Sequence, residues 1–187
     1  MKKIKAFLAK TKMRSALWLA AICLFIVWSI FGYKYQFTYN KGVSMEPTYD
    51  NGDWIIIEKR SWLPKDWAPD RFDVVIIYDE AEGEDLAKRV IGLSGDTFEI
   101  KGGVIYINEK ELEEPFGEGK IGYYLVDEND KNLRYWSGPE QGEKVIQFVD
   151  QKKKKIPEGQ VWVIGDNRIA SWYGLLKIKN IKGLVIL

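Results

Sequence analysis

The sequence predicts a mainly β protein, in which an antiparallel β sandwich or barrel-like domain follows one N-terminal transmembrane helix. Two observations predict this class: an uncharged apolar segment near the N-terminus, and a series of short β-branched runs after about Asn40, bounded by turn residues. The 187 residues suffice for one domain with a proper core. We expect a basic cytoplasmic segment at 1–14, a transmembrane anchor at 15–35 and an extracytoplasmic β-rich domain at 36–187.

The apolar segment reads ALWLAAICLFIVWSIF from Ala16 to Phe31 and contains no charge. Extended to Tyr35, it reaches the length of about 20 residues that spans a bilayer as a helix. Six of the first fourteen residues are Lys or Arg, which favours a cytoplasmic N-terminus. A cleaved secretory signal peptide also has a basic start and an apolar middle, but bulky residues follow this segment where a cleavage site needs small ones. We therefore expect an uncleaved anchor in the lipid bilayer.

The outer domain contains a series of apolar runs that are typical of strands in antiparallel sheets. Two of them flank Lys101-Gly-Gly103 and predict a hairpin. Residues 109–159 are interpreted as a variable insertion or small lobe, within which the run Lys152–Lys155 is interpreted as a solvated turn. The predicted strands are 54–57, 74–78, 86–93, 97–100, 104–108, 145–149, 161–164 and 181–187.

Composition excludes several classes of function. The 173 residues after Arg14 carry 22 basic and 27 acidic side chains, and this acidic balance argues against nucleic acid as a partner. The chain has no histidine, so Ser-His-Asp and Cys-His catalysis are impossible within it. Its one cysteine, Cys23, lies in the apolar segment and can form neither an intramolecular disulfide nor a zinc site. We expect no metal and no cofactor.

A serine nucleophile in this chain would need a base other than histidine, and a neutral lysine can serve. An ordinary lysine, with a pKa near roughly 10.4, is protonated, but burial among apolar groups lowers that pKa. Strand alternation in the run LAKRVIGL aligns Lys88 with Leu86 and Val90, while Arg89 shares the other face with Ala87 and Ile91. Of the two basic residues, only lysine loses its proton readily.

Three ordered motifs follow the anchor. The first is Ser44-Met-Glu-Pro-Thr48, the second is Lys88-Arg-Val-Ile-Gly92 with the following Leu-Ser-Gly-Asp96, and the third is Gly165-Asp-Asn-Arg168. With these motifs in this order behind the anchor, the chain resembles a type I signal peptidase of the Gram-positive, single-anchor form. The resemblance covers the anchor, residues 40–108 and residues 160–171. It implies a serine endopeptidase that removes signal peptides from exported preproteins.

The resemblance assigns Ser44 as the nucleophile and Lys88 as the general base. The Ser44 N–H would donate to the oxyanion, and Gly42 stands where many relatives add a hydroxyl donor. Ser171, three residues after the third motif, would orient the lysine amine. The remaining residues would support the site: Met45 as an apolar floor, Pro47 in the turn after the nucleophile, Asp166 as the partner of Arg89, and Asn167 with Arg168 in the third motif.

The substrates of this family carry small residues at positions −1 and −3 of the cleaved bond and bind as an extended strand. From their apolarity alone, we expect shallow pockets lined by Val43, Ile55, Ile57 and Val90. Four aromatic residues are candidates for contact with the lipid interface, with packing in the core as the alternative: Trp62, Trp67, Trp172 and Tyr173.

Departures from the family pattern leave a second function open. The family continues Ser-x-Asp-Ser-Arg where this chain reads Ser171-Trp-Tyr-Gly-Leu175, so an acid and an arginine are missing. Arg71-Phe-Asp73 stands where many members have Arg-Gly-Asp, and Ser94 stands where proline is common. The alternative is a non-cleaving, pilus-associated assembly factor or chaperone that binds pilin subunits or secreted surface proteins.

Overall fold

The computed structural model describes residues 2–79, 83–124 and 145–186, which form two compact units, 1–36 and 37–187. Helix α1 (Lys2–Lys34) contains a stretch of 19 residues, Ala16–Lys34, that is long and apolar enough to cross a membrane and is not buried within the structure. At about 1.5 Å per residue this stretch is roughly as long as a bilayer core is thick. The helix ends at Lys34, and strand β1 (Tyr35–Tyr39) begins directly after it.

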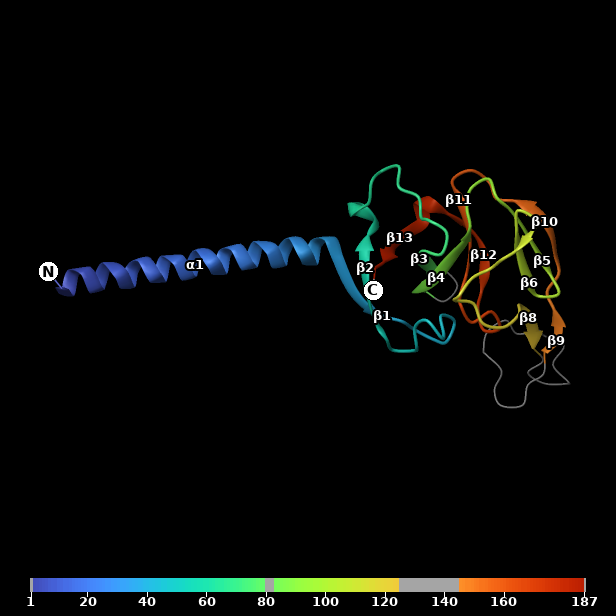
Figure 1. Cartoon of the computed structure of the whole chain (residues 1–187), viewed down its shortest axis with the longest axis horizontal. Helices are drawn as coiled ribbons and strands as arrows, with labels where there is room; N and C mark the ends of the chain where they lie inside the picture. Colours follow the sequence, from blue (N-terminus) through green and yellow to red (C-terminus); the bar gives the residue numbers. More distant parts are fainter. Residues whose placement is uncertain (1, 80–82, 125–144, 187) are drawn as a thin grey trace. The chain divides into compact units, whose positions relative to one another are not determined.

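A seven-stranded antiparallel sheet forms the centre of the second unit, and β4 lies within it (Figure 1). Its strand order is β1-β2-β13-β3-β4-β11-β12, so segments from both ends of the domain meet at its centre. β-Branched residues fill its inner strands, as expected for strands that are covered on both faces. After β1 the strands are β2 (Trp54–Lys59), β3 (Val74–Asp79), β4 (Glu84–Gly92), β11 (Gln160–Ile164), β12 (Tyr173–Lys177) and β13 (Ile181–Val185).

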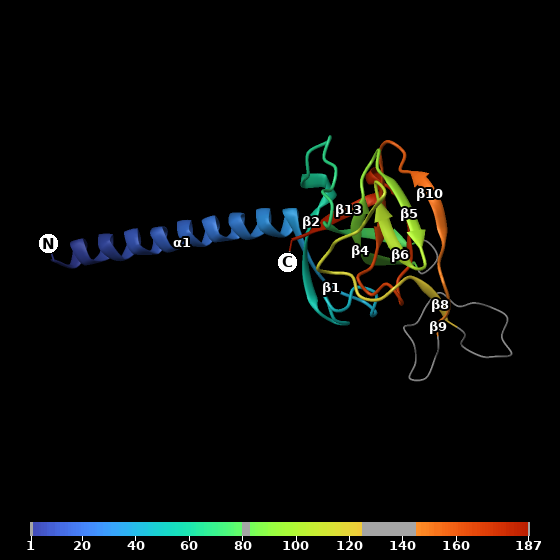
Figure 2. The ribbon, with the colours of Figure 1, turned by 45° about the vertical axis from the view of Figure 1, so that its right-hand side comes forward.

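Two smaller sheets complete the domain, and β5, β6 and β10 lie together in both views (Figures 1 and 2). The four-stranded sheet has the order β10-β5-β6-β7, with β5 (Thr97–Lys101) and β6 (Val104–Ile107) joined by the predicted hairpin at Gly102 and Gly103. The other strands are β7 (Lys110–Glu111), β8 (Gly122–Tyr124), β9 (Val145–Phe148) and β10 (Gln151–Lys155). Within the described residues all three sheets are open, so the barrel-like alternative is wrong.

The core contains three apolar clusters. The first lies around Trp162, whose ring stacks on Phe98 at 5.3 Å between centroids, and it joins the large sheet to the four-stranded one. The second contains Leu86 and Val90, and the third contains Met45 and Ala87, so both faces of β4 are covered. Because β4 is covered on both faces, water has no access to the polar side chains that this strand carries. Their burial determines the protonation of the site described below.

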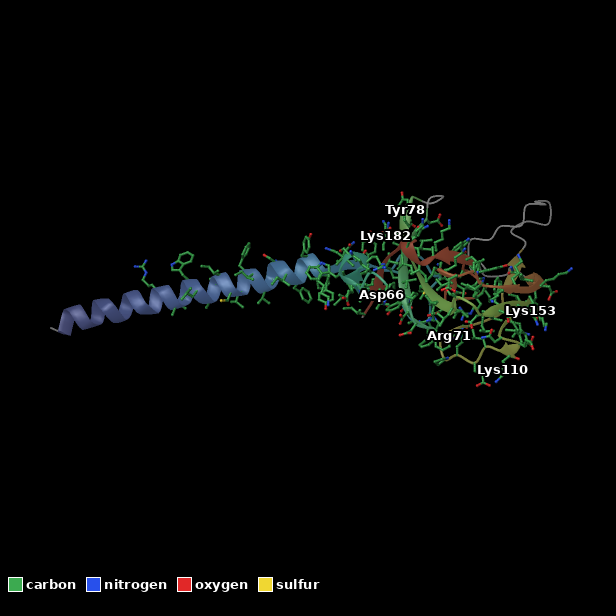
Figure 3. The ribbon with its side chains drawn as sticks, turned by 90° about the horizontal axis from the view of Figure 1, so that it is seen from above. Asp66, Arg71, Tyr78, Lys110, Lys153 and Lys182 are labelled. Carbon is green, nitrogen blue, oxygen red and sulfur yellow. The ribbon has the colours of Figure 1, made fainter. Side chains whose placement is uncertain are left out.

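The lysine run is the clearest correction to the expected secondary structure. The run Lys152–Lys155, which the sequence predicts as a solvated turn, belongs to β10 (Gln151–Lys155), and this strand pairs antiparallel with β5 from Gln151↔Ile100 to Lys155↔Thr97. Its lysine side chains stay exposed, and Lys153 is seen at the surface in Figure 3. Strand β12 was missed as well, whereas the predicted strands 54–57, 74–78, 97–100, 104–108 and 161–164 are confirmed with small changes at their ends.

The four candidate interface aromatics fall into two groups. Trp62 is 43% exposed and so remains available to a lipid surface. Trp67 and Trp172 pack against the second apolar cluster, and Tyr173 packs against the first, 5.7 Å from the Trp162 ring. Packing in the core therefore describes these three aromatics in this structure.

Candidate active site

Strand β4 carries two adjacent basic residues, Lys88 and Arg89, and both are buried, with 2% and 4% of their surface exposed. Burial thus extends to both faces of β4, the one that carries Lys88 and the one that carries Arg89. The strand pairs with β3 through Val75↔Lys88 and with β11 through Ile164↔Arg89. Because strands flank β4 on both sides and apolar clusters cover its faces, each basic side chain must find its polar partner inside the protein.

The loop that holds Ser44 lies between β1 and β2 and is fixed at both of its ends. The Asn40 side chain is buried and donates to the carbonyls of Tyr49 and Asp50 at 3.1 Å each. Gly42 takes the left-handed conformation, φ +74°, which favours glycine, and its N–H donates to Asn51 Oδ1 at 3.0 Å. The Gly42 N–H is thus already engaged within the loop.

Residues next to Ser44 anchor the loop in the protein. Met45 is completely buried in the third apolar cluster, together with Ile55, Val74 and Ala87. The Tyr49 N–H donates to the Met45 carbonyl at 3.0 Å, and Pro47 lies inside the turn that this bond closes. The buried methionine fixes the backbone at Ser44, and its role as an apolar floor stays a prediction.

Ser44 and Lys88 meet in space although they lie 44 positions apart in the chain. Lys88 Nζ is 2.8 Å from Ser44 Oγ, within hydrogen-bond distance. Burial lowers the pKa of Lys88 from 10.5 to about 8, against the smaller opposing effects of Asp79 and Asp166. A serine hydroxyl in contact with an amine that loses its proton near neutral pH is the arrangement that a Ser-Lys nucleophile requires.

The third motif, Gly165–Arg168, contacts the backbone of Ser44 and supports it. The Asn167 N–H donates to the Ser44 carbonyl at 3.1 Å. Gly165 packs so closely that a β-carbon at this position would lie 2.1 Å from the Ser44 carbonyl oxygen and 2.3 Å from Ser171 Oγ. The Asn167 side chain accepts a hydrogen bond from the Ala170 N–H at 3.2 Å, which holds the turn itself.

We expect Gly165→Ala to lower the rate of the peptide-bond cleavage that the resemblance implies by about 100-fold, because a displacement of the nucleophile by about 1 Å has effects of this size. The added β-carbon must displace the Ser44 carbonyl, which belongs to the backbone and cannot rotate away. Gly32→Ala is the control, because a β-carbon at Gly32 meets nothing within 4 Å. Cleavage rates of the two purified variants provide the measurement, and equal rates would contradict the prediction.

Arg89 and Asp166 form a buried ion pair in two-point geometry. Arg89 Nε donates to Asp166 Oδ1 at 2.7 Å and an Nη2 hydrogen goes to Oδ2 at 2.6 Å, with 5% and 0% of the two side chains exposed. Arg89 also donates to the Phe72 carbonyl at 2.7 Å and lies 3.8 Å from the centre of the Phe116 ring. The pair joins the third motif to β4, as the family resemblance implies.

Ser171 is buried beside this motif, but its hydroxyl binds elsewhere than expected. It accepts a hydrogen bond from the Gly165 N–H at 2.6 Å and donates to the Trp172 carbonyl at 2.9 Å. Within the described residues, no hydrogen bond joins Ser171 to Lys88. Ser171 thus orients Gly165, and among the described residues the amine of Lys88 is hydrogen-bonded to Ser44.

The residues proposed for substrate pockets are mostly core residues. Ile55, Ile57 and Val90 are between 0% and 4% exposed and belong to the apolar clusters, whereas Val43 is 38% exposed next to Ser44. Of the four, Val43 is therefore the residue that an approaching peptide can touch. Within the described residues, no group of three or more His, Cys, Asp or Glu side chains is placed to hold a metal ion.

Sequence reasoning missed the segment 112–119, which covers the third motif. Phe116 lies against Arg89 and also 5.7 Å from the Phe72 ring, and Glu114 pairs with the buried Arg168. The Glu118 N–H donates to the Asp166 carbonyl at 2.8 Å. The segment gives no periodic signal, although its mixture of acidic, glycine and aromatic residues between β7 and β8 could have indicated a functional loop.

Comparison with known proteins places this site in a family. The family model described as "Signal peptidase, peptidase S26" matches residues 13–187. Signal peptidase I of Bacillus caldolyticus is 33% identical over 172 residues, which is 90% of this chain and 85% of that protein. Signal peptidase I of Streptococcus pneumoniae TIGR4 is 32% identical over 76% of each chain, and signal peptidase IB of Staphylococcus aureus Mu50 is 31% identical over 89% of this chain and 82% of that protein.

Among solved structures, the crystal structure of a signal peptidase I from Enterococcus faecalis V583 is 28% identical and covers 63% of this chain and 97% of that chain, with a TM-score of 0.40. The family model and the curated relatives together span nearly the whole length described above, including all three motifs and the apolar helix. The chain therefore belongs to the type I signal peptidase family.

Proposed function

We propose that this membrane-anchored protein removes signal peptides from exported preproteins, with Ser44 as the nucleophile and Lys88 as the general base. The contact of 2.8 Å between Lys88 Nζ and Ser44 Oγ, in a site that lowers the pKa of the amine to about 8, carries the proposal. At pH 7 such an amine is neutral in about a tenth of the molecules, against less than about a thousandth for an ordinary lysine. Burial of Lys88 thus provides a neutral general base, the role that histidine has in Ser-His-Asp sites.

The reaction proceeds in two halves. The neutral amine of Lys88 takes the Ser44 proton while Oγ attacks the scissile carbonyl carbon, and the carbonyl oxygen becomes an oxyanion. The Ser44 N–H, which has no hydrogen-bond partner among the described residues, is free to donate to that oxyanion. The protonated Lys88 then gives its proton to the leaving amine, which leaves an acyl-enzyme. Lys88, neutral again, takes a proton from water as the water oxygen attacks the ester carbon. The bond to Ser44 Oγ then breaks, Lys88 returns the proton to Oγ, and the new carboxylate leaves.

The proposal extends to the substrate and to the membrane. Small residues at −1 and −3 fit a site in which Val43 is exposed and the neighbouring apolar residues lie inside the core. The six basic residues within the first fourteen favour a cytoplasmic N-terminus and a catalytic domain on the outer side. Pilin subunits are a further proposed partner, which the chain would bind without cleavage.

The unusual segment after Ser171 is compatible with cleavage. Tyr173–Lys177 forms β12, which pairs with β11 over five residues, and Trp172 packs against the second apolar cluster. Strand pairing and apolar packing thus hold the segment in which the family's acid and arginine are missing. The non-cleaving alternative is not favoured, because a protein that only binds has no use for a Ser44–Lys88 contact.

The pH dependence of cleavage tests the proposal. We expect kcat/KM for a preprotein with an Ala-x-Ala site to rise about tenfold per pH unit from pH 6 and to level off above about pH 8, since the neutral amine is the active form. Ser44→Ala, measured beside the wild type in lipid vesicles, should be inactive although folded. A flat profile, or cleavage by Ser44→Ala, would refute the mechanism.

A further inference from the structure

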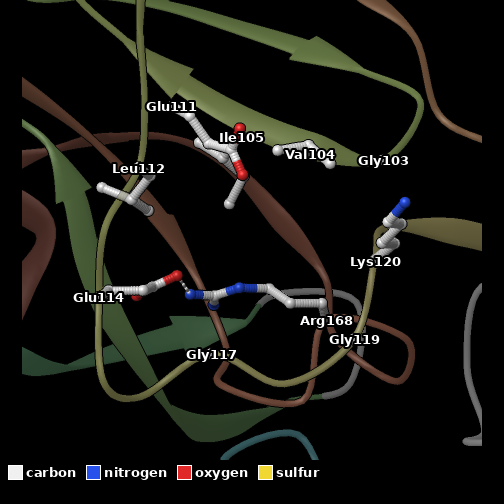
Figure 4. A pocket seen from close by; sticks show the side chains of 10 residues that line it. All are labelled: Gly103, Val104, Ile105, Glu111, Leu112, Glu114, Gly117, Gly119, Lys120 and Arg168. Carbon is white, nitrogen blue, oxygen red and sulfur yellow. Dashed lines mark hydrogen bonds and ion pairs between the residues drawn. The ribbon is translucent and has the colours of Figure 1, made fainter.

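Glu114 and Arg168 form a second buried ion pair, which joins the segment 112–119 to the last residue of the third motif. Their side chains are 9% and 3% exposed, and an Arg168 Nη2 hydrogen contacts Glu114 Oε1 (Figure 4). The other oxygen, Glu114 Oε2, is buried and has no hydrogen-bond partner in the described structure. A buried pair with one unsatisfied oxygen is a poor source of stability, so its presence calls for another explanation.

On the side that faces Glu114, few other groups contact the Arg168 side chain. It lines a cavity of about 250 Å³, together with Glu114, Gly117 and Gly119 (Figure 4). Gly117 packs against the guanidinium so closely that a β-carbon there would lie 2.3 Å from Nη2. With open space on one face and glycine on another, the guanidinium is held by two acceptors, the Glu114 carboxylate on this side and the Gly165 carbonyl on the other.

The other end of this guanidinium reaches the backbone that supports the nucleophile. Arg168 Nη1 donates to the Gly165 carbonyl at 2.5 Å. Gly165 in turn is in contact with the Ser44 carbonyl, and the Asn167 N–H donates to that same carbonyl. A continuous series of contacts therefore runs from Glu114 through Arg168 and Gly165 to Ser44.

The backbone of the same segment is joined to the motif by a separate set of hydrogen bonds. The Arg168 N–H donates to the Glu118 carbonyl at 2.9 Å, the Glu118 N–H donates to the Asp166 carbonyl, and Glu118 and Asn167 form a parallel bridge. These bonds keep the segment folded against the motif when the Glu114 side chain changes. A variant of Glu114 thus tests the carboxylate and not the presence of the segment.

We propose that Glu114 is a positioning residue for peptide-bond cleavage: it holds Arg168 on the Gly165 carbonyl and so fixes Ser44 at its contact with Lys88. This inference rests on the proposed function. Glu114 does not touch the reacting atoms and therefore acts on the orientation of the nucleophile, leaving substrate binding and the proton affinity of Lys88 as they are. Its effect belongs in kcat, because a misoriented nucleophile raises the free energy of the transition state and leaves that of the bound complex unchanged.

Kinetics of three variants of the full chain in vesicles test the proposal. We expect Glu114→Gln to lower kcat about tenfold, with KM and the pH midpoint unchanged. Glu113→Gln, an exposed neighbour that does not line the cavity, should behave as wild type. The double variant Glu114→Leu with Arg168→Met replaces both charges by apolar groups. Its thermal stability should therefore lie closer to the wild-type value than that of Glu114→Gln, while kcat stays low.

Two results would overturn this role: wild-type kcat in Glu114→Gln, or recovery of kcat together with stability in the double variant, which would make the pair merely structural. If the wild type itself fails to cleave, the proposed function has failed, and hydrogen exchange of the Asn167 N–H then decides on Glu114. Faster exchange in Glu114→Gln than in Glu113→Gln supports the positioning role, and equal exchange refutes it.

Discussion

Lys88→Met should abolish cleavage and at the same time stabilise the protein at pH 7. Removal of the base should lower kcat/KM by about 10³-fold or more, because general-base catalysis has effects of this order. The fold, by contrast, loses a buried ammonium. The pKa of Lys88 falls from 10.5 to about 8 on folding, which corresponds to about 3 kcal/mol of unfavourable free energy at neutral pH.

The stabilisation by Lys88→Met depends on pH, because it ends where the folded wild type loses the Lys88 proton. Below pH 8 both folded and unfolded wild-type chains carry the proton, so the variant keeps its full advantage. Between pH 8 and 10.5 the folded wild type loses the proton before the unfolded chain does, and wild-type stability rises towards that of the variant. Above about pH 10.5 the two should differ only by the packing of a methionine in place of a lysine.

Urea unfolding of the full chain in detergent between pH 6 and 11 measures this difference. Lys110→Met is the matched control, because Lys110 is exposed and its replacement should change the unfolding free energy by less than about 0.5 kcal/mol at every pH. A Lys88→Met protein less stable than wild type at pH 7, or with an advantage independent of pH, would contradict the prediction. Such a result would mean that Lys88 remains solvated in the folded protein.

Asp166→Asn should lower the free energy of unfolding by about 3–5 kcal/mol. The substitution leaves the Arg89 guanidinium, 5% exposed, without its counter-charge, and an amide provides only one acceptor where the carboxylate provides two. Arg89 lies directly beside Lys88 on β4, so cleavage should fall as well. The loss is large because one charge is left buried and uncompensated, even though the intact pair contributes little net stability.

An exposed ion pair in the same sheet provides the control for this prediction. Asp85 binds Lys182 at 2.6 Å between β4 and β13, but the two side chains are 42% and 49% exposed. Asp85→Asn should therefore cost no more than about 1 kcal/mol. Urea unfolding of both variants at one pH compares them directly. Similar losses for the two substitutions would show that burial of the Arg89–Asp166 pair has no energetic consequence.

Most of the large sheet could be predicted from the sequence, because its strands are β-branched runs with clear boundaries. The runs Trp54–Ile57 and Val74–Tyr78 carry that signal in the residues themselves. β10 could not be predicted in this way, because its lysines are exposed and only the pairing with β5 makes it a strand. Tertiary context thus overrides the weak strand propensity of lysine.

The candidate site, too, could be predicted from the sequence only in part. Strand alternation identified Lys88 as a candidate base, but its contact with Ser44 came from family resemblance, because no local pattern links residues so far apart. Phe72 is a related case. It stands where the family pattern has the glycine of Arg-Gly-Asp, and its φ of +78° is a conformation that favours glycine. The departure therefore marks a constraint on the backbone. Glu114 could not be found at all, since its partner Arg168 is joined to it only by the fold.

The adjacency of Lys88 and Arg89 on β4 has a consequence for how the protein acquires activity. Side chains of successive strand residues point to opposite faces, so a shift of one residue in the pairing of β4 would exchange the two. Ser44 would then face a guanidinium, which does not lose its proton at any pH that a cell reaches, and Asp166 would face an ammonium. The pairings Val75↔Lys88 and Ile164↔Arg89, formed when the chain folds, thereby select which of two neighbouring cations becomes the base. A misregistered β4 would give a protein of identical composition and nearly identical outline with no catalytic chemistry.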